Sequence, residues 1–220
     1  MTLKKSQAFI TPPLTKIFNN SEQNMTLRPY ALFFRAGLVA IAGLLLGLFA
    51  TVMSLNAGYG FNALQAGPWV AWPAVGAPNS DPYARAVVSR TGEAPLGRDQ
   101  GLTFIAETDS SGAPLDGACD YLLTDPSPAA RFWTLGIVRP DGGLLANPTG
   151  RYGYSSADIL RHDNGGFRIM LSQNPQSGNW LSPGGARKFS LALRLYETTL
   201  DTDAQPNADH FPKITKLACA

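Results

Sequence analysis

The spacing of hydrophobic residues changes twice along the chain. Residues 36–55, AGLVAIAGLLLGLFATVMSL, carry no charge. They predict a membrane-crossing helix, since about 20 apolar residues span the hydrocarbon of a bilayer. Residues 80–92, SDPYARAVVSRTG, predict a short helix with a proline in its first turn and a glycine at its end. From residue 102 onward apolar and polar positions alternate, which is the spacing of strands with one buried face.

The alternating part predicts antiparallel strands joined by tight turns. The clearest strands are expected at 102–107, 119–125, 131–138 and 188–197. The pairs Asp141-Gly142 and Asn164-Gly165 lie between short apolar runs, where they favour hairpin turns. The chain is therefore predicted to be mainly β: an antiparallel β-sandwich or jelly-roll-like domain with a short helix, preceded by one N-terminal transmembrane helix.

Alternation also assigns side chains to faces. In the last strand, residues 189, 191, 193 and 195 form an apolar face, and Arg194 and Tyr196 lie on the other face. In the strand at 131–138, Arg131 and Trp133 share a face with two further apolar residues. Each strand thus places an arginine beside an aromatic residue on one face.

Four parts are expected along the chain. Residues 1–30 are predicted to be a disordered cytoplasmic N-terminus, 31–57 a transmembrane helix acting as a signal anchor, 58–200 a periplasmic β-sandwich domain, and 201–220 a C-terminal tail. A cleaved signal peptide beginning at Met25 is the alternative, but the apolar run is longer than such a segment needs.

The charges around the apolar run predict its orientation. Five basic residues precede it and none lies between residues 56 and 80; the five are Lys4, Lys5, Lys16, Arg28 and Arg35. By the positive-inside rule, the protein is expected to cross its membrane once, with its N-terminus in the cytoplasm and everything after residue 57 outside. In an oxidising compartment outside the cytoplasm, Cys119 and Cys219 are a disulfide candidate.

Composition excludes several functional classes. The chain has 18 basic and 16 acidic residues, and no basic cluster on the folded part that would favour nucleic-acid binding. Its two histidines, His162 and His210, have no second ligand at metal-binding spacing. No phosphate-binding loop, nucleophile elbow or paired-cysteine motif occurs, so the sequence predicts neither a metal nor another cofactor.

Six residues are candidates for ligand binding, and each has a structural alternative. Arg131 and Arg194 suit an anionic ligand, but an internal ion pair is favoured over that role. The aromatic and polar group suits stacking against a sugar, although a place in the core is favoured; its members are Trp133, Asn179, Trp180 and Tyr196. Carboxylates between Glu107 and Asp120 suit acid–base hydrolysis, but carboxylates at strand ends are more often turn formers.

Several segments resemble a bacterial family catalogued as domain of unknown function 1214. The segments are ARFWTLGIV, GFRIMLS, GNWLSP and FSLALRLYET, with GPWVAWP, DPYARAVVSRTGEAPLG and LDGACDY upstream. Ser182 separates Leu181 from Pro183, where the family pattern has leucine followed directly by proline. The upstream segments look like those of membrane-anchored short members. The resemblance implies a β-sandwich or jelly roll and no settled activity. It also implies a companion chain, since larger relatives carry domain of unknown function 1254 in front of this one.

The favoured hypothesis is a membrane-anchored binding or assembly module of the cell envelope. The rival hypothesis is a periplasmic enzyme that acts on envelope saccharide or lipid with arginine and carboxylate chemistry. The two differ in one geometric expectation. An enzyme needs the arginines to meet a carboxylate in an open cleft, whereas a binding module does not.

Overall fold

A computed structural model describes residues 23–56, 63–77, 80, 82–91, 96–97, 100–147 and 149–219. The chain divides into two compact units, Met1–Ala57 and Gly58–Ala220. The expected disordered segment up to residue 22 lies outside the described residues, as do Asp81 and Gly92 at the predicted ends of the short helix.

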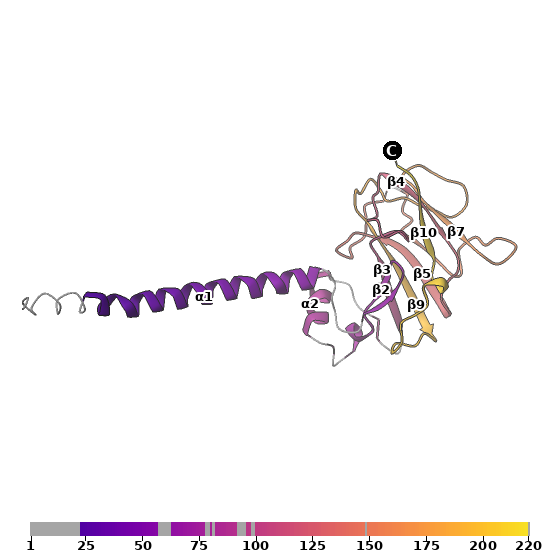
Figure 1. Cartoon of the computed structure of the whole chain (residues 1–220). Coiled ribbons are helices and arrows are strands. Elements are labelled where there is room, and N and C mark those ends of the chain that lie inside the picture. The colour runs from indigo at the N-terminus through magenta and orange to yellow at the C-terminus, as the bar shows by residue number, and fades with distance from the viewer. Residues whose placement is uncertain are drawn as a thin grey trace, which may run out of the picture. The chain divides into compact units, whose positions relative to one another are not determined.

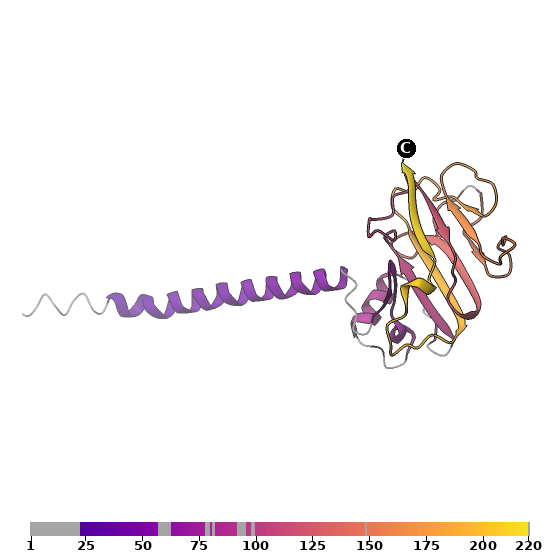
Figure 2. The same ribbon diagram turned by 45° about the vertical axis from the view of Figure 1, so that its right-hand side comes forward.

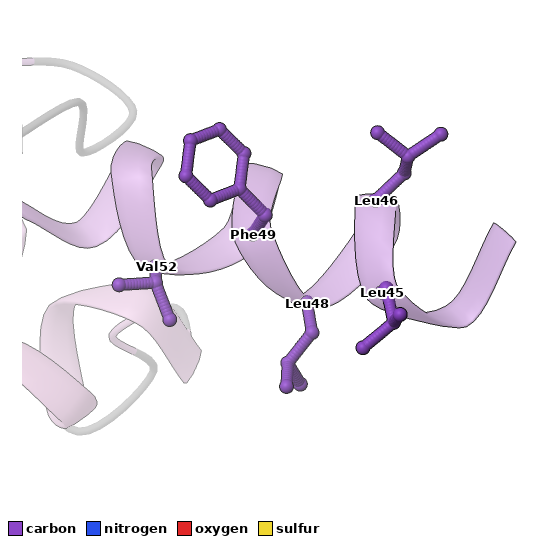
Figure 3. Close-up of a pocket in the computed structure, with 5 residues that line it drawn as sticks. All are labelled: Leu45, Leu46, Leu48, Phe49 and Val52. Atoms are coloured by element: carbon purple, nitrogen blue, oxygen red, sulfur yellow. The ribbon is translucent and has the colours of Figure 1, made fainter. Parts of the chain in front are cut away.

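The first unit contains the helix α1, Gln23–Asn56, which begins before the expected start at residue 31. The stretch Tyr30–Met53 is long and apolar enough to cross a membrane, and none of it is buried within the chain. Leu46 and Phe49 project from one side of α1, and Leu45, Leu48 and Val52 project from the other (Figure 3). The Thr51 hydroxyl donates to the Gly47 carbonyl at 2.8 Å, so this polar group is satisfied within the helix. A helix with apolar side chains on all sides is suited to lipid.

The second unit is a sandwich of two sheets (Figure 1). The six-stranded sheet has the order β1-β2-β3-β9-β5-β6 and is antiparallel throughout. Its strands are β1 (Leu64–Ala66), β2 (Trp69–Ala71), β3 (Gly101–Ala106), β9 (Ser190–Thr198), β5 (Ala130–Val138) and β6 (Gly153–Ser155). The mainly β class is therefore confirmed.

The four-stranded sheet has the order β10-β4-β7-β8. Its strands are β10 (Lys213–Cys219), β4 (Cys119–Thr124), β7 (Arg168–Leu171) and β8 (Trp180–Leu181). This sheet is mixed because β8 runs parallel to β7. The helix α2, Pro82–Thr91, and two short 3-10 helices, Pro73–Gly76 and Ala208–His210, complete the described elements.

Alternating side chains fill the space between the sheets. Leu191, Leu193 and Leu195 of β9 are at most 1% exposed, which confirms the apolar face expected for this strand. On β5 the inward residues begin at Trp133, whereas Arg131 lies at the exposed start of the strand. The facing strands of the other sheet contribute Tyr121, Leu123, Ile169 and Leu171, all at most 1% exposed.

Aromatic side chains join the two sheets along both sides of the sandwich. On one side, the Trp69 indole N–H donates to the Pro212 carbonyl at 2.8 Å. On the other side, the Tyr154 hydroxyl of β6 accepts from the Trp180 amide N–H of β8 at 3.0 Å. These hydrogen bonds satisfy the polar groups of the aromatic side chains and connect segments on the two sides of the sandwich.

The sequence had indicated a C-terminal tail from residue 201 onward. In the structure this C-terminal region belongs to the domain. Residues 213–219 form β10, which pairs with β4 and runs to the C-terminus in yellow (Figure 2). Cys119 and Cys219 form the predicted disulfide, with an S–S distance of 2.09 Å. The strand and the disulfide together attach the chain end to the sheet.

Both predicted turns are present. Gly142 has a φ of 82° in the turn after β5, and Gly165 has a φ of 79° in the turn between Arg161 and Phe167. These are left-handed conformations that glycine adopts without strain.

Candidate interaction surface

The six predicted ligand-binding residues are distributed over different surfaces of the sandwich. Trp133 lies in the core, 3% exposed, with its ring centroid 5.2 Å from that of Phe167. Arg131 is exposed and forms an ion pair with Glu197 at 2.9 Å. This carboxylate raises the pKa of Arg131 above its usual value, first through its hydrogen bond and then through its charge.

Arg194 and Tyr196 lie on the outer face of the six-stranded sheet, away from the leucines of β9. Arg194 is half-buried and stands in register between Thr103 of β3 and Thr134 of β5. The Tyr196 ring lies 5.7 Å from the ring of Phe132. The face predicted for these two residues is confirmed.

Asn179 holds neighbouring segments of the chain together. It is 7% exposed, and its side-chain oxygen accepts from the Leu160 amide N–H at 2.8 Å. Its side-chain amide group donates to the carbonyls of Leu160 and Arg168, both at 2.8 Å. All three bonds go to main-chain groups, so the side chain is fully engaged by the fold.

Arg131 and Glu107, an arginine and a carboxylate of the enzymatic hypothesis, lie at different ends of the six-stranded sheet. Arg131 lies beside the end of β9 that carries Glu197. Glu107 follows Ala106, which pairs with Leu191 near the opposite end of β9. The register therefore separates these charged groups.

The buried carboxylate of the same hypothesis, Asp109, shapes a turn. It is 3% exposed and accepts from the Ser111 amide, the Ser111 hydroxyl and the Ala113 amide at 2.6 to 3.0 Å. Burial opposes its ionisation, but these hydrogen bonds and the charge of Lys216 outweigh that effect, so the pKa of Asp109 lies below its usual value. Among the described residues, no group of three His, Cys, Asp or Glu could hold a metal ion.

Two hollows in the described part of the chain are also separate from the six residues. One, of about 270 Å³, lies between the edge of β1 and residues 202–205. Another lies along α1 itself and is lined only by the apolar residues shown in Figure 3. Neither hollow contains a predicted ligand-binding residue.

The outer face of the four-stranded sheet carries a row of apolar side chains. The register places Leu122 of β4 opposite Met170 of β7, and Met170 opposite Trp180 of β8. All three are half-buried, and we call them the apolar row. The Trp180 indole N–H donates to the Ser172 carbonyl at 2.8 Å, which holds the ring at this face. On β10, Thr215 continues the row opposite Leu122, and Leu217 is 51% exposed.

Three exposed cations border the apolar row, and we call them the cationic border. Lys213 and Arg168 stand on either side of Thr124 in register, on the face of the apolar row. Lys216 follows on β10 at the exposed edge, in register with the inward-facing Tyr121, so its side chain starts from the opposite face. None of the three forms an ion pair with another described residue. The acidic residue on this face, Asp120, is half-buried on the other side of Leu122.

The sequence contained a local signal for the apolar row that was not used. Each of its members stands next to a buried apolar residue, in the strings YLL, IML and NWL. Consecutive apolar residues in a strand place apolar groups on both faces of the sheet. The cationic border gave no such signal because β10 was not predicted as a strand.

Two solved structures are similar to part of this chain. No curated protein matches this chain. The VPA0106 protein of Vibrio parahaemolyticus is 22% identical with a TM-score of 0.49, and the match covers 64% of this chain and 36% of that one. A protein of Burkholderia cenocepacia described as uncharacterised is 21% identical with a TM-score of 0.37, and that match covers 66% and 46%. This chain therefore spans less than half of the length of either protein.

The family comparison agrees with the resemblance seen in the sequence. A family model described as protein of unknown function (DUF1214) matches residues 100–200. The matched part runs from β3 to β9 and so includes the apolar row and most of both sheets. Residues 100–200 are therefore similar to the DUF1214 family.

Proposed function

We propose that this protein is a membrane-anchored binding or assembly module of the bacterial cell envelope. In this proposal α1 anchors the chain in the inner membrane, and the sandwich domain binds a partner protein on the outer face of its four-stranded sheet. The observation that carries the proposal is the apolar row beside the cationic border.

The composition of this face supports protein binding. An apolar centre with charged residues at its margin is the usual arrangement of a protein–protein interface. Trp180 and Met170 are residue types enriched in such interfaces, and Trp180 is already held in position by its bond to Ser172. A partner with an apolar centre and acidic residues at its margin would complement this face.

The anchor and the disulfide support the location. The basic residues before the apolar run at 36–55 and their absence just after it favour a cytoplasmic N-terminus. A disulfide between Cys119 and Cys219 is compatible with a domain in an oxidising compartment such as the periplasm. The resemblance to larger relatives nominates a chain carrying domain of unknown function 1254 as the partner.

Site-specific crosslinking in native membranes tests the proposal. A photoreactive amino acid is introduced at Met170, on the apolar row, or at Thr134, which faces outward on the six-stranded sheet. We expect a discrete crosslinked protein from position 170 and not from position 134. Equal crosslinking from both positions, or none from position 170, would remove the four-stranded sheet as the binding face.

A further inference from the structure

The edge strand β10 is a second feature of the proposed binding face on the four-stranded sheet. Strand β10 is paired only with β4, and its residues 215–219 are all exposed. The main chain of Ile214 is bonded to Ser110 through its carbonyl and through its amide N–H, both at 2.9 Å. The loop that contains Ser110 therefore covers the edge of the sheet at Ile214.

The edge is open at Lys216. Main-chain groups of successive residues in a strand point to alternate sides, so those of Lys216 point the same way as those of Ile214, away from β4. Ser110 engages Ile214, but no turn or loop main-chain group among the described residues bonds to Lys216. An unpaired strand edge is a template for another strand.

The charges along β10 decide which strand fits. Lys213 and Lys216 lie on β10 itself, and Arg168 lies beyond Thr124 on the same outer face as Lys213. A second copy of this chain pairing through the same edge would bring like charges together, which is unfavourable between strands. An acidic segment would instead bring its carboxylates beside the two lysines of β10, and Arg168 would add positive charge further into the sheet.

We propose that the edge of β10 from Lys216 onward accepts an extended acidic segment of a partner protein by strand addition. This inference rests on the proposed function and names the partner's contacting element. The main-chain ladder supplies affinity without regard to sequence, and the lysines select acidic side chains. Apolar side chains of the added segment contact the exposed Leu217 of β10.

Peptide binding to the full-length chain in neutral detergent tests the proposal. The probe is a short fluorescent peptide in which valine alternates with glutamate. One control peptide has N-methylated main-chain amides, which cannot form a ladder, and a second has lysine in place of glutamate. We expect the acidic probe to bind and both control peptides to bind at least about tenfold more weakly, because a tenfold change corresponds to roughly one or two lost hydrogen bonds.

Two variants locate the binding. Lys216→Pro removes the outward N–H, so we expect it to bind the acidic probe roughly tenfold more weakly with little change in the melting temperature, since proline is tolerated at strand edges. The double variant Arg168→Glu with Lys213→Glu keeps every main-chain group and reverses two charges. It should prefer the lysine probe, whereas Arg139→Glu, the same change on the hairpin after β5, should leave the preference unchanged.

Several outcomes would overturn strand addition. They are undiminished binding to Lys216→Pro, equal binding of the N-methylated peptide, an unaltered charge preference in the double variant, and binding of anionic phosphatidylglycerol vesicles in place of the peptide. The crosslinking experiment separates this failure from failure of the proposed function. A crosslink from position 170 that survives Lys216→Pro keeps the binding face and removes the strand edge.

Discussion

The two sheets of the sandwich share one core but differ in how their exposed cations are used. On the six-stranded side, Arg131, Arg139 and Arg151 pair with Glu197, Asp141 and Asp158 at 2.9, 2.9 and 4.0 Å. On the four-stranded side, the cationic border has no ion pair within the described residues and stands next to apolar side chains. This contrast is the reason for proposing the four-stranded sheet as the binding face.

The largest effect on stability is expected when the disulfide that attaches β10 to β4 is removed. Cys219→Ser should lower the free energy of unfolding by about 4 to 5 kcal/mol, because the disulfide closes a loop of 100 residues and restricts the unfolded chain. Chemical denaturation of the full chain in detergent measures this effect. Ala218→Ser, at the neighbouring exposed position, should be nearly neutral.

Amide hydrogen exchange of the Cys219→Ser variant compares the two sheets directly. We expect faster exchange of the β10 amides and unchanged protection in β5 and β9, which lie at the centre of the other sheet. Equal loss of protection in both sheets would show that the four-stranded sheet has no separate dependence on the disulfide.

Two adjacent residues of β7 compare the inner and outer faces. Ile169 is fully buried between the sheets, so Ile169→Ala should cost about 2 to 5 kcal/mol of stability. Met170 is half-buried on the apolar row, so Met170→Ala should cost less than about 1 kcal/mol. Comparable losses, measured by denaturation, would place Met170 in a second core and remove it from an interaction surface.

Much of the fold was predictable because its information is local. Alternation located β3, β4, β5 and β9, and the Asp141-Gly142 and Asn164-Gly165 pairs located two turns. By contrast, β10 has only Ile214 buried and lacks a regular alternation. Its conformation depends on pairing with β4, which lies about a hundred residues earlier in the chain.

The interaction surface was harder to predict because it combines distant segments. Alternation shows that Arg194 and Tyr196 share a face, but it does not show which other strands lie near their own strand. Leu122, Met170 and Trp180 come together only through the pairing of β4 with β7 and of β7 with β8. That pairing includes a parallel contact between two strands close in sequence, which no turn signal indicated.

Asn179 tests whether a predicted ligand-binding residue acts in the fold. Asn179→Ala should lower stability by about 2 to 3 kcal/mol, because main-chain groups of Leu160 and Arg168 lose three hydrogen bonds to the Asn179 side chain. Asn174→Ala, an exposed residue in the same segment, is the matched control. A stable Asn179→Ala variant would favour a role in ligand binding.

Asp109 predicts how stability depends on pH beside β10. The folded pKa of Asp109 is below its unfolded value of about 3.9. Its contribution to the free energy of unfolding is therefore present at neutral pH and is lost as the pH falls through the folded pKa. Asp109→Asn should therefore be less stable at neutral pH by roughly 1 kcal/mol and should show a shallower loss in acid. Asp120→Asn, measured alongside, checks for a general charge effect; identical acid profiles for Asp109→Asn and the unmodified protein would contradict the assignment.

The smallest change in stability is expected when single cations of the two sheets are neutralised. Arg131→Met breaks an exposed ion pair, which should lower stability slightly, because solvent screens charges at the surface. Arg168→Met breaks no ion pair among the described residues and should leave stability within about 0.5 kcal/mol. Crosslinking from position 170 should show the reverse order. Arg168→Met should reduce the crosslinking yield more than Arg131→Met, because Arg168 belongs to the cationic border and Arg131 is already neutralised by Glu197. If Arg131→Met reduced crosslinking as much as Arg168→Met, the difference in ion pairing between the two sheets would have no bearing on where a partner binds.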